Sequence, residues 1–290
     1  MHERAATAAG GLWSDAGRRL TANRIAFAAL AGIVVMALFA VLAPHLSPWG
    51  YDSLDWRHLA QPPGLTAAHW FGTDRLGRDL FVRTLHGVRL SLLISLLASA
   101  LSVGIGVAWG AVAGFVGGRT EEAMMRFVDV LYSLPYLFFV IILSAVIGRG
   151  SIAVLLLAIG AVGWLTTARI VHGQTLQLKR RQFIEAARAT GLTTAAILTR
   201  HVVPNLAGTV VVYAALTVPQ MILFESFLSF LGLGVQEPHA SLGNLINAGA
   251  QEMESAPWML LVPAAFLVLL LTCLNLLGDG LRDALDPRDH

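Results

Sequence analysis

The residues that usually carry chemistry form no catalytic pattern in this sequence. No Gly-x-x-x-x-Gly-Lys-Ser/Thr run is present, and the single lysine, Lys179, lies in a Leu-Lys-Arg run. The chain therefore lacks a phosphate-cradling loop of the P-loop type. His-Glu-x-x-His and Gly-x-Ser-x-Gly are absent as well, and these are the patterns of metalloproteases and of serine hydrolases. We predict no catalytic residue and no cofactor bound by this chain.

The ligands that transition metals prefer are also not arranged as a site. None of the nine histidines, which include His45, His58, His69 and His86, follows a metal-ligand spacing. The only cysteine, Cys273, lies in an apolar run, where a thiol usually behaves as a small buried hydrophobic group. We predict neither a metal site nor a reactive thiol.

One acidic residue interrupts an apolar stretch. The apolar run that ends at Phe224 is split by Glu225 and resumes from Phe227 to Val235. An ionisable group in such a place is a functional candidate, and a helix over Val202–Glu225 rises about 34 Å, which places Glu225 near the outer face. Two interpretations stay open. The carboxylate faces a translocation path or a partner subunit, or it forms a structural ion pair, for instance with an arginine of an earlier loop.

A short segment after the fourth apolar stretch combines charges, small side chains and turn formers. It begins with a Glu-Ala-Ala run at 185–187 in an alanine-rich helix, and Gly191 suits the left-handed position that ends a helix. Thr193 or Thr194 can then cap a second helix. Pro204 would interrupt the backbone hydrogen bonds where the chain re-enters the membrane. Such a hairpin would fit a groove of another protein, and a plain polar linker is the alternative.

Long uncharged stretches surround these residues. The chain of 290 residues is 56% hydrophobic and only 13% charged, whereas a soluble domain contains about 25% charged residues. A spanning helix needs roughly 20 apolar residues. Six stretches without Asp, Glu, Lys or Arg are long enough: Ile25–Ala43, Leu90–Gly118, Val130–Gly148, Gly150–Ala168, Val202–Phe224 and Ser255–Gly278. We predict an all-α polytopic protein with six transmembrane helices and lipid around much of its surface.

The distribution of basic residues predicts the orientation of these helices. Arg and Lys are concentrated before the first stretch and after the fourth, while the segment Gly234–Ala256 between the fifth and sixth stretches has three glutamates and no Arg or Lys. Basic loops tend to stay in the cytoplasm. The loop before the second stretch holds five arginines and four aspartates, and we still place it outside. The first stretch is expected to remain as a span because it lacks a clean Ala-x-Ala cleavage site.

This orientation divides the chain into five parts. They are a cytoplasmic N-terminal segment 1–24, a first transmembrane helix 25–43, an external loop 44–89, a core of five transmembrane helices 90–278 with a cytoplasmic coupling segment 179–204, and a cytoplasmic tail 279–290. The external loop contains Trp49, Trp56 and Trp70. These either lie at the membrane surface, as aromatic belts do, or pack within a small folded loop.

Four glycines predict close helix packing. Gly106, Gly110, Gly114 and Gly118 are each four residues apart, so they form one stripe on a helix. Such a stripe lets the backbone of a neighbouring helix approach closely. The sequence does not identify that neighbour.

The segment at 185–204 resembles the EAA motif of ABC importer permeases. The glutamate is followed by the glycine after six residues, and the proline follows thirteen residues later. In that family this segment is the coupling helix that docks into the ATPase subunit. A histidine stands where the general pattern has isoleucine, and a similar histidine is familiar in the peptide-importer branch. The resemblance implies these ATPase-coupling residues: Glu185, Ala186, Ala187, Gly191, His201 and Pro204.

Three further segments resemble permeases for dipeptides and oligopeptides. They are Phe71–Asp79, Asn275–Pro287 and Met221–Pro238, and the last is similar to the C-type permease of oligopeptide systems in particular. The resemblance covers residues 20–290. It implies a type I ABC importer permease fold in the bacterial cytoplasmic membrane. The implied partners are a second permease, two ATPase subunits that bind the ATP, and an external peptide-binding protein.

Other classes of function fit the sequence less well. A secondary transporter or channel would favour inverted repeats or several intramembrane charges, and the halves show no repeat. An intramembrane enzyme needs a catalytic dyad or metal ligands within its spans, and none is present. Nucleic-acid binding is not predicted, because the arginines are scattered among loops rather than gathered on one face.

Overall fold

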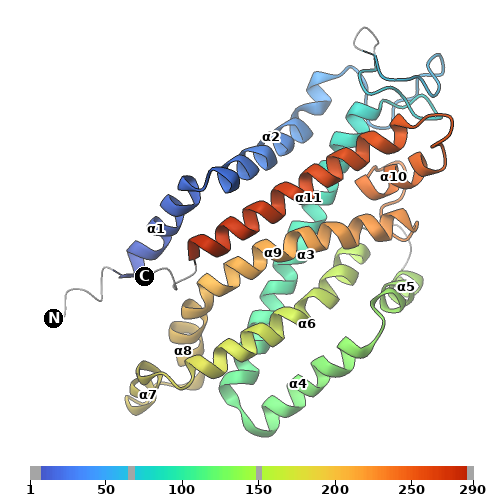
Figure 1. Ribbon diagram of the computed structural model, residues 1–290. Helices are drawn as coiled ribbons and strands as arrows, with labels where there is room; N and C mark the ends of the chain where they lie inside the picture. The colour runs from blue at the N-terminus through green and yellow to red at the C-terminus, as the bar shows by residue number, and fades with distance from the viewer. Residues whose placement is uncertain (1–7, 65–68, 148–151, 286–290) are drawn as a thin grey trace.

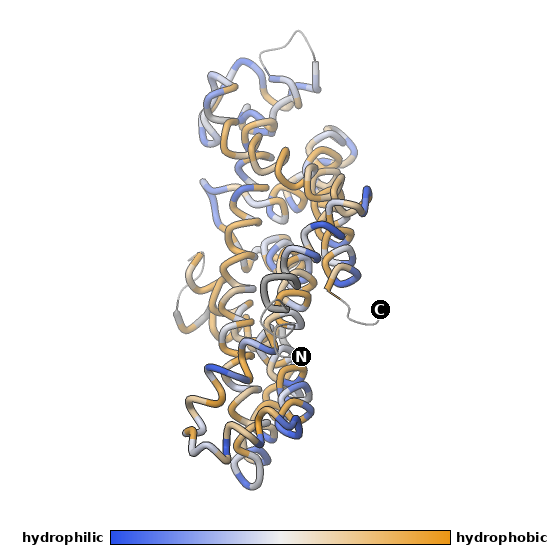
Figure 2. The backbone as a smooth tube through the Cα atoms, turned by 90° about the vertical axis from the view of Figure 1, so that its left-hand side faces the viewer, coloured by the Kyte–Doolittle hydropathy of each residue, from blue (hydrophilic) through white to orange (hydrophobic). Residues whose placement is uncertain are grey.

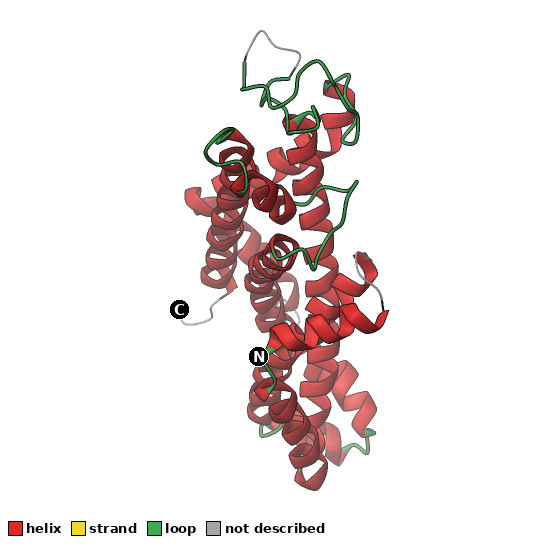
Figure 3. Cartoon of the chain, turned by 90° about the vertical axis from the view of Figure 1, so that its right-hand side faces the viewer, coloured by secondary structure: helices red, strands yellow, loops and turns green. Residues whose placement is uncertain are grey.

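The computed structural model describes residues 8–64, 69–147 and 152–285, and these residues form helices and loops without a strand (Figure 1; Figure 3). The elements are α1 (Ala8–Ala22), α2 (Arg24–Leu46), α3 (Leu80–Val116), α4 (Gly118–Ser133), α5 (Tyr136–Ile147), α6 (Ile152–Leu178), α7 (Gln182–Ala189), α8 (Thr194–Ile197), a π-helical turn (Leu198–Val202), α9 (Val203–Phe230), α10 (Leu242–Ala250) and α11 (Trp258–Leu285). The predicted all-α class is confirmed.

Within the described residues, five helices are long and apolar enough to cross a membrane. They are α2, α3, α6, the continuous helix Thr194–Phe230 and α11. The third predicted span, Val130–Gly148, is wrong as one straight helix, because α4 and α5 meet at a bend of 90°. Leu134 is extended at this bend, as expected for a residue before proline, and Pro135 follows it. Counted together, α4 and α5 give a sixth, broken span.

Helix α3 lies at the centre and contacts α2, α6, α9 and α11. One apolar core joins α2, α3, α9 and α11, and a second joins α3, α6 and α9 near the start of α5. Figure 2 shows the result in hydropathy: the long helices are largely hydrophobic, and hydrophilic segments gather in the loops at the upper and lower ends. This pattern is typical of a bundle whose middle faces lipid.

The predicted glycine stripe is a packing seam between α3 and α6. A Cβ atom added at Gly106, Gly110 or Gly114 would lie 2.5, 2.4 or 2.9 Å from atoms of α6. The stripe is therefore confirmed at three positions, and its partner is α6. Gly118 is not part of it, because α3 ends at Val116 and an added Cβ there would meet nothing within 4 Å.

Several helices run further than the uncharged stretches that predicted them, and α3 and α6 do so by ten residues each. Helix α3 begins at Leu80, ten residues before the uncharged stretch that predicted it and inside the segment 44–89 predicted as a loop. A charged residue interrupts an uncharged stretch of sequence, but it does not have to end a helix. The Asp79 side chain caps α3 by accepting the Val82 amide at 2.8 Å, and Arg83 in its first turn donates to the Tyr51 carbonyl at 2.9 Å. In the same way α6 continues to Leu178.

The two segments predicted to be external lie at the same end of the molecule. The loop after α2 and the segment around α10 are both at the top of Figure 1, whereas α7 lies at the bottom. Ion pairs join the two segments: Arg75 contacts Glu252, and Arg78 contacts Glu237 at 2.8 Å. Two of the arginines that made this loop unusual for an external one thus have acidic partners in the other segment.

Candidate functional site

The segment predicted to couple the chain to an ATPase is a helical hairpin built from local capping. Gly191 has φ +80°. Its amide donates to the Arg188 carbonyl at 2.9 Å, and the Leu192 amide donates to the Ala187 carbonyl at 3.2 Å. This pair of bonds is the Schellman motif, in which a left-handed residue ends a helix. The predicted role of Gly191 in the turn is confirmed.

The second half of the hairpin continues into the membrane without a break. Thr193 caps it by accepting the Ala196 amide at 3.3 Å. The helix then passes through the π turn into α9, and Val203 donates to Leu198, five residues back. The α-helical hydrogen-bond register changes at the π turn directly before Pro204, which lies in the first turn of α9, and the helix itself continues. Proline is tolerated in the first turn after such a change, because the N–H that proline lacks is not needed for an α-helical hydrogen bond there.

Three apolar side chains anchor the hairpin to the bundle. Ile184 and Ile197 are fully buried and Ala187 nearly so, in a cluster shared with Phe115 of α3 and Val171 of α6. The guanidinium of Arg188 also lies over the Phe115 ring at 4.9 Å from its centroid. The hairpin is therefore packed against α3 and α6.

The remaining predicted coupling residues lie mostly on the surface. Glu185, Ala186, Gly191 and Pro204 are exposed, and His201 is half-buried. Ala187 differs, because it faces the core of this chain and offers no contact surface. Sequence reasoning missed Phe183, whose side chain is 41% exposed beside Glu185. An exposed aromatic on a rigid hairpin is a typical anchor for a partner's pocket.

The side chain of Glu225 is buried between helices of this chain. Its side chain is 0% exposed. Ser91 of α3 donates to Oε2 at 2.6 Å, and Ser229 of α9 donates to Oε1 at 2.8 Å. The Ser91 hydroxyl also lies 3.4 Å from the Leu242 amide at the start of α10. The carboxylate therefore joins three helices through hydroxyls. It pairs with no arginine among the described contacts, and its role at a translocation path stays a prediction.

Replacing Glu225 by leucine is expected to destabilise the folded chain. The hydroxyls of Ser91 and Ser229 would lose their acceptor in a buried place, at a cost of about 1–3 kcal/mol for each unsatisfied group. Glu225→Gln keeps an acceptor and the shape, so it should stay close to wild type. The thermal midpoint of the purified protein, followed by size-exclusion chromatography after heating, measures the difference. Equal midpoints for the leucine and wild-type proteins would contradict this account.

A cavity of about 440 Å³ lies between α4, α5, α6 and α9. Its lining is mainly apolar, with polar groups from Thr166 of α6 and from Thr217 and Gln220 of α9. Ligand sites in proteins usually have such a volume and such a mixture. Sequence reasoning did not indicate this cavity, because the α4–α5 bend that shapes it was not predicted and because its fourth wall comes from α9, beyond the hairpin.

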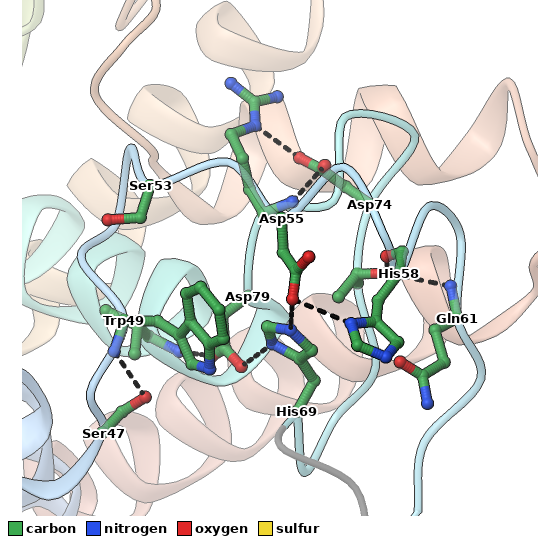
Figure 4. A network of polar contacts seen from close by, with 12 residues as sticks. Ser47, Trp49, Ser53, Asp55, His58, Gln61, His69, Asp74 and Asp79 are labelled. Carbon is green, nitrogen blue, oxygen red and sulfur yellow. Dashed lines mark hydrogen bonds and ion pairs between the residues drawn. The ribbon is translucent and has the colours of Figure 1, made fainter.

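The external end contains a polar network that sequence spacing did not reveal (Figure 4). Oδ2 of Asp55 lies 2.8 Å from Nδ1 of His58 and 3.4 Å from Nε2 of His69. The other ring nitrogen of His69 lies 2.8 Å from Oδ2 of Asp79, the residue that caps α3. The hydrogen bond from His58 is the main cause that lowers the pKa of Asp55 from 3.8 to about 2.

The three tryptophans of this loop were expected either at the membrane surface or packed within the loop, and both settings occur. The Trp49 ring packs against His69, with ring centroids 4.6 Å apart, as expected for a folded loop. Trp56 and Trp70 are 68% and 47% exposed, as expected for side chains that can reach a membrane surface.

Known proteins share both the sequence and the fold. Residues 106–288 match the family described as binding-protein-dependent transport system inner membrane component. The chain belongs to this family. Residues 11–63 also match the N-terminal TM domain of oligopeptide transport permease C. The family consists of membrane permease components rather than ATPases, and the chain is a multi-pass inner membrane protein.

Relatives in this family match nearly the whole chain. The oligopeptide transport system permease protein OppC of Escherichia coli (strain K12) is 54% identical over 279 residues, which cover 96% of this chain and 92% of the relative. The protein of the same name from Bacillus subtilis (strain 168) is 43% identical over 277 residues, covering 96% and 90%. The dipeptide transport system permease protein DppC of Bacillus subtilis is 44% identical over 275 residues, covering 94% and 85%.

Solved structures show the same fold at low sequence identity. A chain of the MetNI methionine ABC transporter, solved in inward-facing conformations, aligns with a TM-score of 0.56 and 17% identity, and covers 68% of this chain and 94% of that chain. The fold is that of a type I ABC importer permease, as the resemblance implied.

Proposed function

We propose that this family member is a permease subunit of an ATP-driven importer that carries peptides, oligopeptides first, across the bacterial inner membrane by alternating access. The observation that carries the proposal is the 54% identity, over 96% of the chain, to a relative named as an oligopeptide permease. The described helices are those of a translocation unit, and the sequence lacks a P-loop. ATP is therefore bound by partner subunits.

The proposed partners follow from the surfaces that the chain presents. Two ATPase subunits bind ATP, and one of them docks on the face of the hairpin that carries Phe183, Glu185 and Ala186, which are all exposed. A second permease completes the translocation path, and an external binding protein delivers the peptide. In this assembly the present chain breaks no bond.

The hairpin is suited to transmit movement because both of its ends continue into the bundle. Ile184 and Ala187 attach α7 to the ends of α3 and α6. The helix from Thr194 to Phe230 is continuous, and its later turns supply Thr217 and Gln220 to the cavity. A displacement of the hairpin would therefore move a wall of the cavity. ATP must bind one arrangement of the ATPases better than the other for this movement to occur. We propose that the cavity is this chain's half of the peptide path.

The experiment is peptide uptake in a strain that lacks this gene and has no paralogous system. Deletion should abolish uptake of labelled oligopeptides and make the cells resistant to toxic peptides, and a plasmid copy should restore both. The purified whole complex then defines the substrate, because its ATPase should respond to oligopeptides more than to dipeptides, nickel chelates or oligosaccharides. Normal oligopeptide uptake in the deletion strain would overturn the proposal.

A further inference from the structure

Three potential metal ligands converge at the external end of the molecule. They are Nδ1 of His58, Nε2 of His69 and an oxygen of Asp55, and all three lie within 4.8 Å of one another. In a tetrahedral site with metal–ligand bonds of about 2.0–2.1 Å, neighbouring ligand atoms are about 3.3 Å apart. The observed separations from the Asp55 oxygen are 2.8 and 3.4 Å. The two separations from Asp55 are therefore close to this geometry, and the two histidine nitrogens lie within 4.8 Å of each other.

His69 is held as a metal-ligating histidine usually is. Its side chain is 0% exposed, its ring packs on Trp49, and Nδ1 contacts the Asp79 carboxylate at 2.8 Å. A carboxylate on the far nitrogen fixes the ring orientation and the tautomer of a metal-bound histidine. Asp79 is itself fixed, because its other oxygen caps α3. The side chains of His69 and Asp79 are thus both buried and held in place.

The nitrogen that faces Asp55 has no satisfactory partner in a neutral histidine. When Nδ1 of His69 donates its proton to Asp79, Nε2 carries a lone pair. That lone pair is directed at Oδ2 of Asp55, a second acceptor, at 3.4 Å. Two acceptors attract each other only through a cation or a proton between them.

We propose that Asp55, His58 and His69 bind one divalent transition-metal ion of the zinc class, with Asp79 as the positioning residue for His69. Nitrogen ligands and a single carboxylate favour zinc, nickel or copper over magnesium and calcium, which prefer oxygen ligands. The His58 side chain is 43% exposed, so the site is open on one side to entry of the ion and to a water molecule as the fourth ligand.

The ion would join three parts of the external end. Asp55 and His58 belong to the first half of the loop, His69 to its second half, and Asp79 to the start of α3. Metal binding would thus fix the loop on the helix that forms the centre of the bundle. This inference is independent of the transported substrate.

The test is zinc binding by the purified complex after treatment with a chelator. The variants His58→Ala and Asp55→Asn remove one ligand each from partly exposed positions. His45→Ala is the matched control, because His45 is an exposed histidine at the end of α2, before the loop. Equilibrium dialysis against Zn²⁺, with metal measured by elemental analysis, gives the affinity. The absorption spectrum of bound Co²⁺ reports whether the ligands are tetrahedral.

We expect wild type and His45→Ala to bind one more Zn²⁺ per copy of this chain than the two ligand variants, whose affinity should fall at least 10-fold. Excess Mg²⁺ or Ca²⁺ should not displace the ion, and Asp79→Asn should weaken binding by about 10–100-fold. Elution of each variant as an intact complex excludes unfolding as the cause. Equal zinc content in wild type, His58→Ala and Asp55→Asn would overturn the proposal and leave a network held by protons alone.

Discussion

A Gly110→Val variant is expected to be lost from the membrane as folded protein. A Cβ at this position would lie 2.4 Å from the Ala168 carbonyl oxygen of α6. A backbone atom in the middle of a long helix cannot move aside as a flexible side chain can. Overpacking of this kind costs about 1–3 kcal/mol or more, and the closely packed glycines on either side allow no local relief. The helices α3 and α6 would separate along the seam.

The amount of protein in washed membranes, followed by its elution in mild detergent, measures this effect. Gly104→Val is the matched control, because it places the same side chain on the same helix where an added Cβ meets nothing within 4 Å. We expect Gly104→Val to accumulate and elute like wild type. Equal amounts of the Gly104 and Gly110 variants would show that the seam tolerates a larger separation than the structure has.

A Gly191→Val variant is expected to accumulate normally and to lose transport. Gly191 has φ +80° and has open space around it, so valine would not collide with a neighbour. The change acts only through the backbone, because a β-branched residue avoids this conformation at a cost of about 1–3 kcal/mol. The turn between α7 and α8 would open, and the docking face would lose its shape. The spans do not depend on this turn.

Peptide uptake and co-purification of the ATPase subunits measure the two consequences. Gly191→Asn is the control, because asparagine enters the left-handed region more readily than other side chains do. It should retain most transport, and Gly191→Val should retain little and bind the ATPases weakly. Wild-type uptake by the valine variant, with the ATPases still bound, would mean that the segment is a linker without a role in coupling.

The parts of the fold that sequence reasoning predicted well depend on local interactions. The turn at Gly191 and the cap at Thr193 use hydrogen bonds between residues at most five positions apart, so the sequence contains all of the information. The apolar spans were also predictable, because a long uncharged stretch is a property of the local sequence. The α3–α6 seam was half predicted, because the stripe is local and its partner is not.

The parts that were not predicted depend on distant residues or on a balance of opposing preferences. The partner of Glu225 is Ser91, 134 residues earlier, and no local pattern connects them. The histidine cluster needs a folded loop to bring His69 to Asp55. The chain stays helical at Pro204 although proline has no backbone N–H, because the π turn before it shifts the hydrogen-bond register.

The π turn at Leu198–Val202 has a consequence for how this family member tolerates insertions and deletions. A wide turn contains one residue more than the α-helical path would need. Each residue of an α-helix turns the chain by about 100°. The extra residue therefore sets the rotation of the hairpin about the axis of the helix Thr194–Phe230. Removing a single residue here would leave this helix nearly as long and present a different side of the hairpin to whatever docks there. An insertion or deletion at this point would therefore change the orientation of the hairpin and leave the length of the helix almost unchanged.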